Sequence, residues 1–126
     1  MVESQRYYVQ WFRVIDGDSV EVGITANGSI RLPFYSLPIM LGPIKHVVRI
    51  LGIQAPELRD PGGPEAKEFL RNWLATSPPV FLATDGKRDK YGRLLGDFVA
   101  EDRAVSESML AAGHATVAPW KDEPTL

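Results

Sequence analysis

Two arginines and one glutamate stand out in this sequence because their side chains could act together on a phosphodiester. Arg49 and Glu57 bracket an apolar stretch that bends at a glycine and a proline, and Arg93 lies in a charged loop further along the chain. A guanidinium group binds a phosphate through two parallel hydrogen bonds, a geometry that lysine cannot form. A carboxylate can orient or deprotonate a water molecule. We therefore interpret these three residues as candidate catalytic residues, with Glu57 as the base.

The spacing between Arg49 and Glu57 predicts that both side chains lie on one face of a strand. Residues 48–57 begin as an apolar, β-branched run, and eight positions separate the arginine from the glutamate. Side chains alternate between the two faces of a β-strand, so an even separation keeps two residues on the same face. A surface ion pair is the alternative interpretation, and pairs of that kind contribute little to stability.

Asp18 is the strongest candidate for a metal ligand, and it lies in the acidic sequence Asp16-Gly17-Asp18. The chain has no cysteine and two well-separated histidines, so a metal here would be bound by oxygen atoms. Oxygen ligands favour hard cations, above all Ca²⁺ and also Mg²⁺ or Mn²⁺. A hairpin turn without any metal explains the same residues, because aspartate and glycine both suit tight turns. Both interpretations stay open from the residues alone.

Length and composition limit what this protein can be. With 126 residues, 44% of them hydrophobic and 24% charged, the chain has the composition of one soluble globular domain. The net charge of −2 argues against a long basic surface for nucleic acid, although it is compatible with one small phosphate pocket. No apolar run approaches the roughly 20 residues that span a bilayer, and no secretory signal is recognisable. We expect a cytoplasmic protein with no membrane contact, or a secreted one if a leader has been removed.

The expected elements place the candidate residues on loops between short strands. Strands are expected at 7–14, 19–24, 80–84 and 94–99, with a last extended piece at 114–118 and hairpin turns at 16–18 and at Asn27-Gly28. Apolar residues at 66, 69, 70, 73 and 74 follow a 3.6-residue period and predict a helix that starts at Pro64 and ends at 76–79. A second short helix is expected at 105–112, with Met109 and Leu110 buried and with Gly113 after it. Small β-barrels with an inserted helix fit this order, and five-stranded barrels of that kind commonly bind polyanions.

Residues 29–47 do not fit that barrel. The stretch is apolar but contains Pro33, Pro38 and Pro43, and proline cannot donate a hydrogen bond to a neighbouring strand. We expect a loop whose apolar side chains pack on the domain. The alternative is an exposed hydrophobic patch that contacts a partner or a second copy of the chain, which would make the protein a homodimer through 29–47.

Four segments of the chain together resemble the staphylococcal (micrococcal) nuclease family. They are residues 15–20, 49–57, 63–66 and 89–94, and they stand in the family's order. The resemblance covers roughly residues 8–118 apart from 29–47, which looks like an insertion. It implies an OB-fold-like five-stranded β-barrel with helices, an α+β fold. It also implies a Ca²⁺-dependent phosphodiesterase that acts on nucleic acid, DNA or RNA.

The resemblance also implies a role for individual residues. Arg49, Glu57 and Arg93 match the catalytic arginine, glutamate and second arginine of the family, and Asp18 matches a calcium-ligating aspartate. Further matches are Gln54 and the backbone carbonyl of Ala55 at metal-ligand positions, and Asp89, Lys90 and Tyr91 near the nucleotide phosphate.

Two departures from the family leave a second function class open. The family usually has an aspartate where this chain has Gln54, and the amide keeps an oxygen but loses the charge, so affinity for a hard cation should fall. The terminal helix of the family is expected to be missing, because only the tail 119–126 follows Ala118. The chain is therefore expected to be a single nuclease domain, weakened at its metal site. The alternative is a catalytically impaired module of the same fold that binds nucleic acid or protein.

Overall fold

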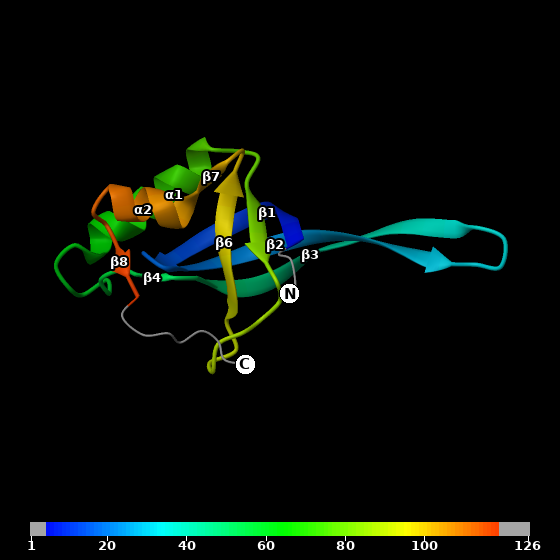
Figure 1. Cartoon of the computed structure of the whole chain (residues 1–126), viewed down its shortest axis with the longest axis horizontal. Helices are drawn as coiled ribbons and strands as arrows, with labels where there is room; N and C mark the ends of the chain where they lie inside the picture. Colours follow the sequence, from blue (N-terminus) through cyan, green and yellow to red (C-terminus); the bar gives the residue numbers. More distant parts are fainter. Residues whose placement is uncertain (1–4, 119–126) are drawn as a thin grey trace.

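The computed structural model describes residues 5–118, which form a curled, mainly antiparallel sheet with two helices against it (Figure 1). The main sheet has six strands in the order β3-β2-β1-β5-β6-β7, and β3 also pairs in parallel with β6, which curls the sheet toward a barrel. The elements are β1 (Gln5–Asp16), β2 (Ser19–Arg31), β3 (Ser36–Ile50), β4 (Ile53–Gln54), α1 (Gly63–Thr76), β5 (Phe81–Thr84), β6 (Leu94–Ala100), β7 (Arg103–Ala104), α2 (Val105–Ala111) and β8 (Thr116–Val117). The predicted OB-fold-like α+β architecture is confirmed.

The core lies between the inner face of the curled sheet and the two helices. Alternate residues of the strands point inward, among them Val20, Val22, Val48 and Phe98, which are fully buried. This is the two-residue period of a strand with one face in the core. Burying one such side chain stabilises the fold by about 1.5–3 kcal/mol.

Helix α1 is the element that the sequence predicted best. It begins at Gly63, has Pro64 in its first turn, and ends before the two prolines at 78 and 79. Its buried side chains are those of the predicted face, including Leu70 and Trp73, while Phe69 is half-buried. Helix α2 is also confirmed, although only Met109 of the predicted pair is fully buried. Neither of the two helices described is long and apolar enough to cross a membrane.

The hairpin turn predicted at Asn27-Gly28 is wrong. Both residues lie inside β2, opposite Met40 and Ile39 of β3. The chain instead reverses after Leu32, whose N–H donates to the carbonyl oxygen of Tyr35 at 2.8 Å. An Asn-Gly pair favours a tight turn but does not require one, and here the pairing with β3 continues for three further positions along β2.

The prediction that residues 29–47 form a loop packed on the domain is also wrong. The outer parts of β2 and β3 pair with each other from Ala26 with Leu41 to Arg31 with Ser36. Residues 26–44 thereby form a β-hairpin arm that projects from the body (Figure 1). Pro38 and Pro43 lie in β3, which at these positions has a neighbouring strand on one side only, so no partner on the outer side is deprived of a hydrogen bond. A register shift between Ile24 and Ala26 marks the base of the arm. Gly42 is needed there, because its φ is 130° and a Cβ would lie 2.7 Å from the carbonyl oxygen of Ile24.

The expected tail 119–126, and with it the question of a missing terminal helix, lies outside the described residues. The segment before it ends in β8, which pairs with β4 in a separate two-stranded sheet. The N–H of Ala118 donates to the carbonyl oxygen of Gly52 at 3.0 Å, which fixes the last described residue to the turn between β3 and β4.

Candidate active site

The turn between β1 and β2 is held close to two other parts of the chain. A Cβ at Gly17 would lie 2.6 Å from the Cβ of Ala55 and 2.9 Å from that of Ala66, so only glycine allows this approach. The approach brings Asp18 beside the residues that follow β4, and the N–H of Ala55 donates to Asp18 Oδ2 at 3.0 Å. The carboxylate of Asp18 is thereby fixed at the end of the sheet where β2 begins.

Arg49 is held in place by the backbone that follows it. It lies on β3 directly opposite Ser19 of β2. Its Nη1 donates to the carbonyl oxygen of Ile53 at 2.8 Å and also to that of Ile50, and its Nη2 lies 3.9 Å from Asp18 Oδ2. Only 13% of its side chain is exposed. The guanidinium group is therefore fixed with one edge on the turn after β3 and the other toward Asp18.

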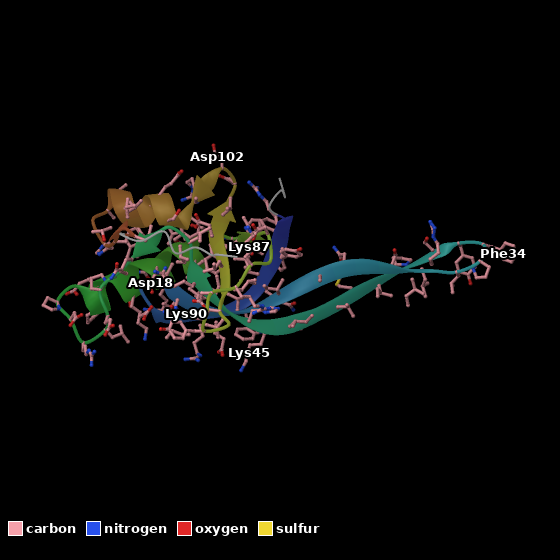
Figure 2. The ribbon with its side chains drawn as sticks, turned by 60° about the horizontal axis from the view of Figure 1, so that its bottom comes forward. Asp18, Phe34, Lys45, Lys87, Lys90 and Asp102 are labelled. Carbon is pink, nitrogen blue, oxygen red and sulfur yellow. The ribbon has the colours of Figure 1, made fainter. Side chains whose placement is uncertain are left out.

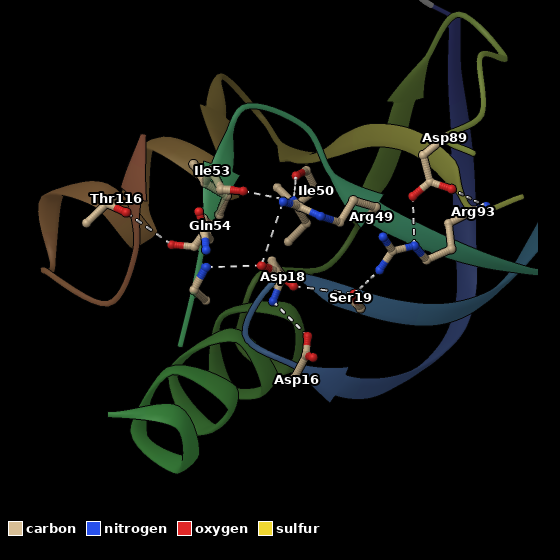
Figure 3. A network of polar contacts seen from close by, with 11 residues as sticks. Asp16, Asp18, Ser19, Arg49, Ile50, Ile53, Gln54, Asp89, Arg93 and Thr116 are labelled. Atoms are coloured by element: carbon tan, nitrogen blue, oxygen red, sulfur yellow. Dashed lines mark hydrogen bonds and ion pairs between the residues drawn. The ribbon is translucent and has the colours of Figure 1, made fainter. Parts of the chain in front are cut away.

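Arg93 approaches the same turn from the neighbouring strand. It immediately precedes β6, which runs parallel to β3 with Leu95 opposite Arg49. Its Nη1 lies 3.4 Å from Ser19 Oγ, and its Nε donates to Asp89 Oδ2 at 2.8 Å. Figure 3 shows the two guanidinium groups converging on Asp18 and Ser19, which are adjacent in the chain. The structure thus brings together three of the predicted site residues, Asp18, Arg49 and Arg93.

The loop 89–93 is organised around one carboxylate. Asp89 Oδ1 accepts the N–H groups of Tyr91 and Arg93, each at 2.9 Å, and Oδ2 accepts Nε of Arg93. Burial acts to raise the pKa of Asp89, but these hydrogen bonds and the charge of Arg93 outweigh it and hold the pKa below its ordinary value. Asp89 was predicted to lie near a bound phosphate; in this geometry its oxygen atoms bind Arg93 and the loop backbone.

Lys90 and Tyr91 lie on the exposed side of the same loop. The Tyr91 ring is mostly exposed, with Lys90 Nζ 5.4 Å and Arg93 Cζ 5.5 Å from its centroid. Cations at this distance are attracted to the ring face. The loop therefore presents two cationic groups around one aromatic ring, a combination suited to a nucleotide.

The prediction that Arg49 and Glu57 project from one strand is wrong. Strand β3 ends at Ile50, a turn with Gly52 at a φ of 85° follows, and Glu57 lies in a turn beyond the two-residue β4. Side chains alternate between two faces only within one strand, so an even spacing across this turn does not place two residues on the same face. The Glu57 side chain is 65% exposed and pairs with Arg59 at 3.2 Å. Among residues 5–118 no hydrogen bond or ion pair joins Glu57 to Arg49 or to Arg93.

Asp16 is a site residue that the sequence analysis did not single out. Its Oδ1 accepts the N–H of Asp18 at 3.2 Å. Burial raises the pKa of Asp16 above its ordinary value, and the neighbouring Asp18 carboxylate raises it further. The signal in the sequence was the pair of acids around Gly17, which indicated a turn and a ligand equally well.

The oxygen atoms at this turn fit a weakly held hard cation. Two partly buried carboxylates on one turn repel each other, and a divalent cation between them would remove that repulsion. Gln54 lies beside them on β4, but its side chain is exposed and its backbone carbonyl accepts a long, 3.5 Å hydrogen bond from Thr116 Oγ1. Within residues 5–118 no group of three or more histidine, aspartate or glutamate side chains is placed to hold a metal. The groups that could bind a cation here are all oxygen atoms, and only the carboxylates of Asp16 and Asp18 among them carry a charge.

Comparison with known proteins identifies the family. Residues 47–125 match the sequence model of the family described as staphylococcal nuclease homologue, which is more than half of the chain. The chain belongs to the staphylococcal nuclease family, so the predicted resemblance is confirmed.

Curated relatives match over most of this chain but are longer than it. It is 28% identical over 116 residues to an uncharacterized endonuclease of Escherichia coli, covering 90% of this chain and 63% of that protein. It is 32% identical over 114 residues to the SPbeta prophage-derived endonuclease YokF of Bacillus subtilis (strain 168), covering 84% of this chain and 32% of that protein. The staphylococcal-like nuclease CAN1 of Arabidopsis thaliana is 28% identical over 119 residues, which cover 86% of this chain and 35% of CAN1. The chain spans less than two thirds of each, and 19% of the protein named probable staphylococcal-like nuclease CAN2 of Oryza sativa subsp. japonica.

Proposed function

We propose that this chain is a nuclease that hydrolyses phosphodiester bonds in DNA or RNA. The observation that supports it most is the convergence of Arg49 and Arg93 on Asp18 and Ser19 from two neighbouring strands. A phosphate bound between the two guanidinium groups would receive charge-assisted hydrogen bonds from both sides. The same groups would stabilise the negative charge that grows on its oxygen atoms as the bond to the leaving alkoxide breaks.

Glu57 is our candidate for the general base. Glu57 lies two residues after Ala55 on an exposed loop, and its ion pair with Arg59 is exposed to solvent. Such pairs are weak, so the carboxylate is free to turn toward a water molecule near a bound phosphate. A general base must come within hydrogen-bond distance of that water in the complex, and geometry without substrate is commonly looser.

A divalent cation, Ca²⁺ first and Mg²⁺ or Mn²⁺ as alternatives, would be held by Asp18 and the Ala55 carbonyl, with Asp16 and Gln54 next to them. Bound there, it would supply positive charge near the phosphate. Gln54 contributes no charge, so we expect the chain to bind the cation weakly. Gln54→Asp should therefore tighten Ca²⁺ binding in titration calorimetry, whereas Gln54→Asn, the neutral variant of the same length as aspartate, should not. Equal affinities of the two variants would place the cation elsewhere.

The second candidate function is a binding module without catalysis. Two observations favour it: the missing carboxylate at Gln54 and the net charge of −2, which lowers the affinity for a polyanion. The module would keep the phosphate-binding arginines but would not hydrolyse the bond.

One assay separates the two functions. Release of acid-soluble nucleotides from denatured DNA and from RNA is measured with Ca²⁺, Mg²⁺ and Mn²⁺ and with a chelator. A nuclease should lose roughly 10²–10³ in rate in Glu57→Gln and in Arg93→Ala, the loss usual for removing one group that stabilises the transition state. Arg59→Ala, which removes only the partner of Glu57, and Arg13→Ala, a surface arginine paired with Glu21, serve as controls and should remain active. No release with any of the three metals would reject the nuclease and leave the binding module.

A further inference from the structure

The arm, residues 26–44, is a two-stranded ribbon whose two faces differ in character. Four pairs face each other at every second position: Ala26 with Leu41, Gly28 with Ile39 and Ile30 with Leu37 along β2, and Leu32 with Tyr35 in the turn just beyond it. Side chains alternate between the faces of a strand, so all four pairs share one face. All eight of its residues are apolar, aromatic or glycine, and we call it the apolar face.

The opposite face of the arm is polar for most of its length. The pairs between those of the apolar face are Asn27 with Met40, Ser29 with Pro38, and Arg31 with Ser36. Arg31 is the one charged residue in 26–44. The ribbon therefore has the alternation of a strand pair with one face in a core, but no element of residues 5–118 supplies a core on that side.

No helix or strand of the described part of the chain covers the apolar face. In the two views of the molecule, Figures 1 and 2, the arm extends away from the body with Phe34 at its tip and no other element beside its outer part. Of its side chains, Ile30, Leu37 and Leu41 are 47%, 47% and 51% exposed, and Tyr35 is 63% exposed. An isolated two-stranded hairpin is at best marginally stable in water, because neither face has a layer to pack on. A cover for this face would stabilise the arm.

The size of the apolar face and its lack of charge favour a second copy of this chain as the partner that covers it. Its exposed fractions correspond to on the order of 500 Å² per chain, so two copies would bury about 1,000 Å², the size at which specific interfaces begin. A nucleic acid requires basic side chains, and a lipid surface is bound best by a basic polar face; this arm offers one arginine. A two-fold interface packs the same surface against itself, and an uncharged apolar face meets no charge repulsion from its copy.

The shape of the face fits the same partner. Gly28 carries no side chain, and Ile39 lies across it, with Cγ1 3.7 Å from the position of a glycine Cβ. With the small side chain of Ala26 two positions away on the same face, this part of the arm carries little side-chain bulk, which would let an opposing ribbon approach closely. We propose that the chain forms a two-fold dimer in which the apolar faces of two arms pack against each other as two layers, about 10 Å apart.

Sedimentation velocity of the 126-residue chain over a wide concentration range tests the dimer. We expect a species of twice the 14.0 kDa chain mass. Leu37→Asp and Ile39→Asp each place a carboxylate in the apolar interface and should raise the dissociation constant at least about tenfold, because a buried charge without a partner is costly. Met40→Asp introduces the same charge next to Ile39 but on the opposite face, and it should leave the dimer intact. Thermal unfolding followed by circular dichroism verifies that all three variants are folded.

Several results would overturn the proposal. One is a monomer at every concentration, and another is a dimer that Leu37→Asp and Ile39→Asp leave unchanged. A monomer that pellets with phosphatidylcholine vesicles, and no longer does so in Leu37→Asp, would assign the face to lipid. A monomer whose affinity for single-stranded DNA falls in Leu37→Asp but not in Met40→Asp would assign the face to nucleic acid instead.

Discussion

At the scale of single residues, the candidate site depends on the oxygen atoms that fix the two guanidinium groups as well as on the guanidinium groups themselves. Arg49 is held by backbone carbonyls and faces Asp18, whereas Arg93 is held by Asp89. Both arginines are preorganised before any phosphate binds. Preorganised charge stabilises a transition state without the cost of rearranging groups during the reaction.

The contact between Asp89 and Arg93 yields a prediction for a positioning residue. In Asp89→Asn the amide keeps an oxygen for the backbone N–H groups but turns its NH₂ toward Nε of Arg93, so the guanidinium loses its fixed orientation. We expect the nuclease rate constant kcat to fall about tenfold, less than in Arg93→Ala, and the double variant to be no slower than Arg93→Ala alone. Asp85→Asn, in the same loop and paired with Lys87, is the control. Additive losses in the double variant would mean that Asp89 acts independently of Arg93.

Asp97 predicts how stability changes with pH. Burial raises the pKa of Asp97 above its ordinary value of 3.8, although hydrogen bonds from the Ser106 and Phe98 N–H groups and the Ser106 hydroxyl act in the opposite direction. The folded protein therefore holds a proton that the unfolded chain has already lost. This contributes stability below pH 3.8 that disappears as the pH rises through the folded pKa.

Asp97→Asn removes this titration and can keep all three contacts, since the Ser106 hydroxyl can accept from the new NH₂ group. Relative to the variant, the wild type should become less stable as the pH rises from below 3.8 through the folded pKa. Urea unfolding at a series of pH values measures the difference. A difference in the free energy of unfolding that does not change with pH, or that changes in the opposite direction, would contradict the raised pKa.

At the scale of elements, the site is assembled by one tight approach between the β1–β2 turn, the segment after β4 and helix α1. Gly17 permits that approach. Gly17→Ala would push its Cβ into those of Ala55 and Ala66, and overpacking of this kind costs about 1–3 kcal/mol. We expect a comparable loss of stability in chemical denaturation, together with a fall in nuclease activity because Asp18 moves away from the Ala55 N–H.

Gly28→Ala is the matched control for Gly17→Ala. A Cβ at Gly28 would make only ordinary contacts, the nearest at 3.7 Å from Ile39 Cγ1. At protein concentrations where the chain is monomeric, its effect on the free energy of unfolding should therefore be within the range of neutral surface changes. Equal losses at the two glycines would show that a change in backbone conformational freedom, rather than the close approach, decides the outcome.

Local periodicity in the sequence was enough to predict helix α1, because its apolar residues repeat at the helical spacing and proline limits both ends. The strands that hold the core were predicted from their β-branched and aromatic composition and from the turn residues between them. The arm could not be predicted, since three prolines and an Asn-Gly pair indicate turns in isolation, whereas pairing along the full length of β2 and β3 overrides them. The relation between Arg49 and Glu57 failed because parity along a strand was assumed across Gly52, where the chain turns.

The candidate site residues were therefore chosen by type and order, and their geometry was not predicted. The convergence of Arg49 and Arg93 depends on the parallel pairing of β3 with β6, a contact between distant segments that no local pattern encodes. The importance of Asp16 depends on how close Gly17 comes to Ala55 and Ala66. Both contacts are set by tertiary packing between segments that are distant in the sequence.

At the scale of the whole molecule, β2 and β3 connect the two features that carry the proposals. The inner ends of these strands bear Ser19 and Arg49 at the candidate site, and the outer ends form the arm (Figure 1). In a dimer through the arms, each candidate site would therefore lie away from the interface. Dimerisation and chemistry are then separable by mutation.

Removal of the outer arm tests this separation. Replacing residues 27–40 by an Asn-Gly turn joins Ala26 to Leu41, which already lie opposite each other. None of the deleted residues belongs to the buried core, whose members on these strands are Val20, Val22, Ile24, Val48 and Ile50. The shortened chain should fold, sediment as a monomer, and cleave short oligonucleotides with the kcat of the full chain, because the strand ends that carry Ser19 and Arg49 are retained. A shortened chain that fails to fold would show that the arm stabilises the body, and one that folds as a dimer would show that the interface lies elsewhere.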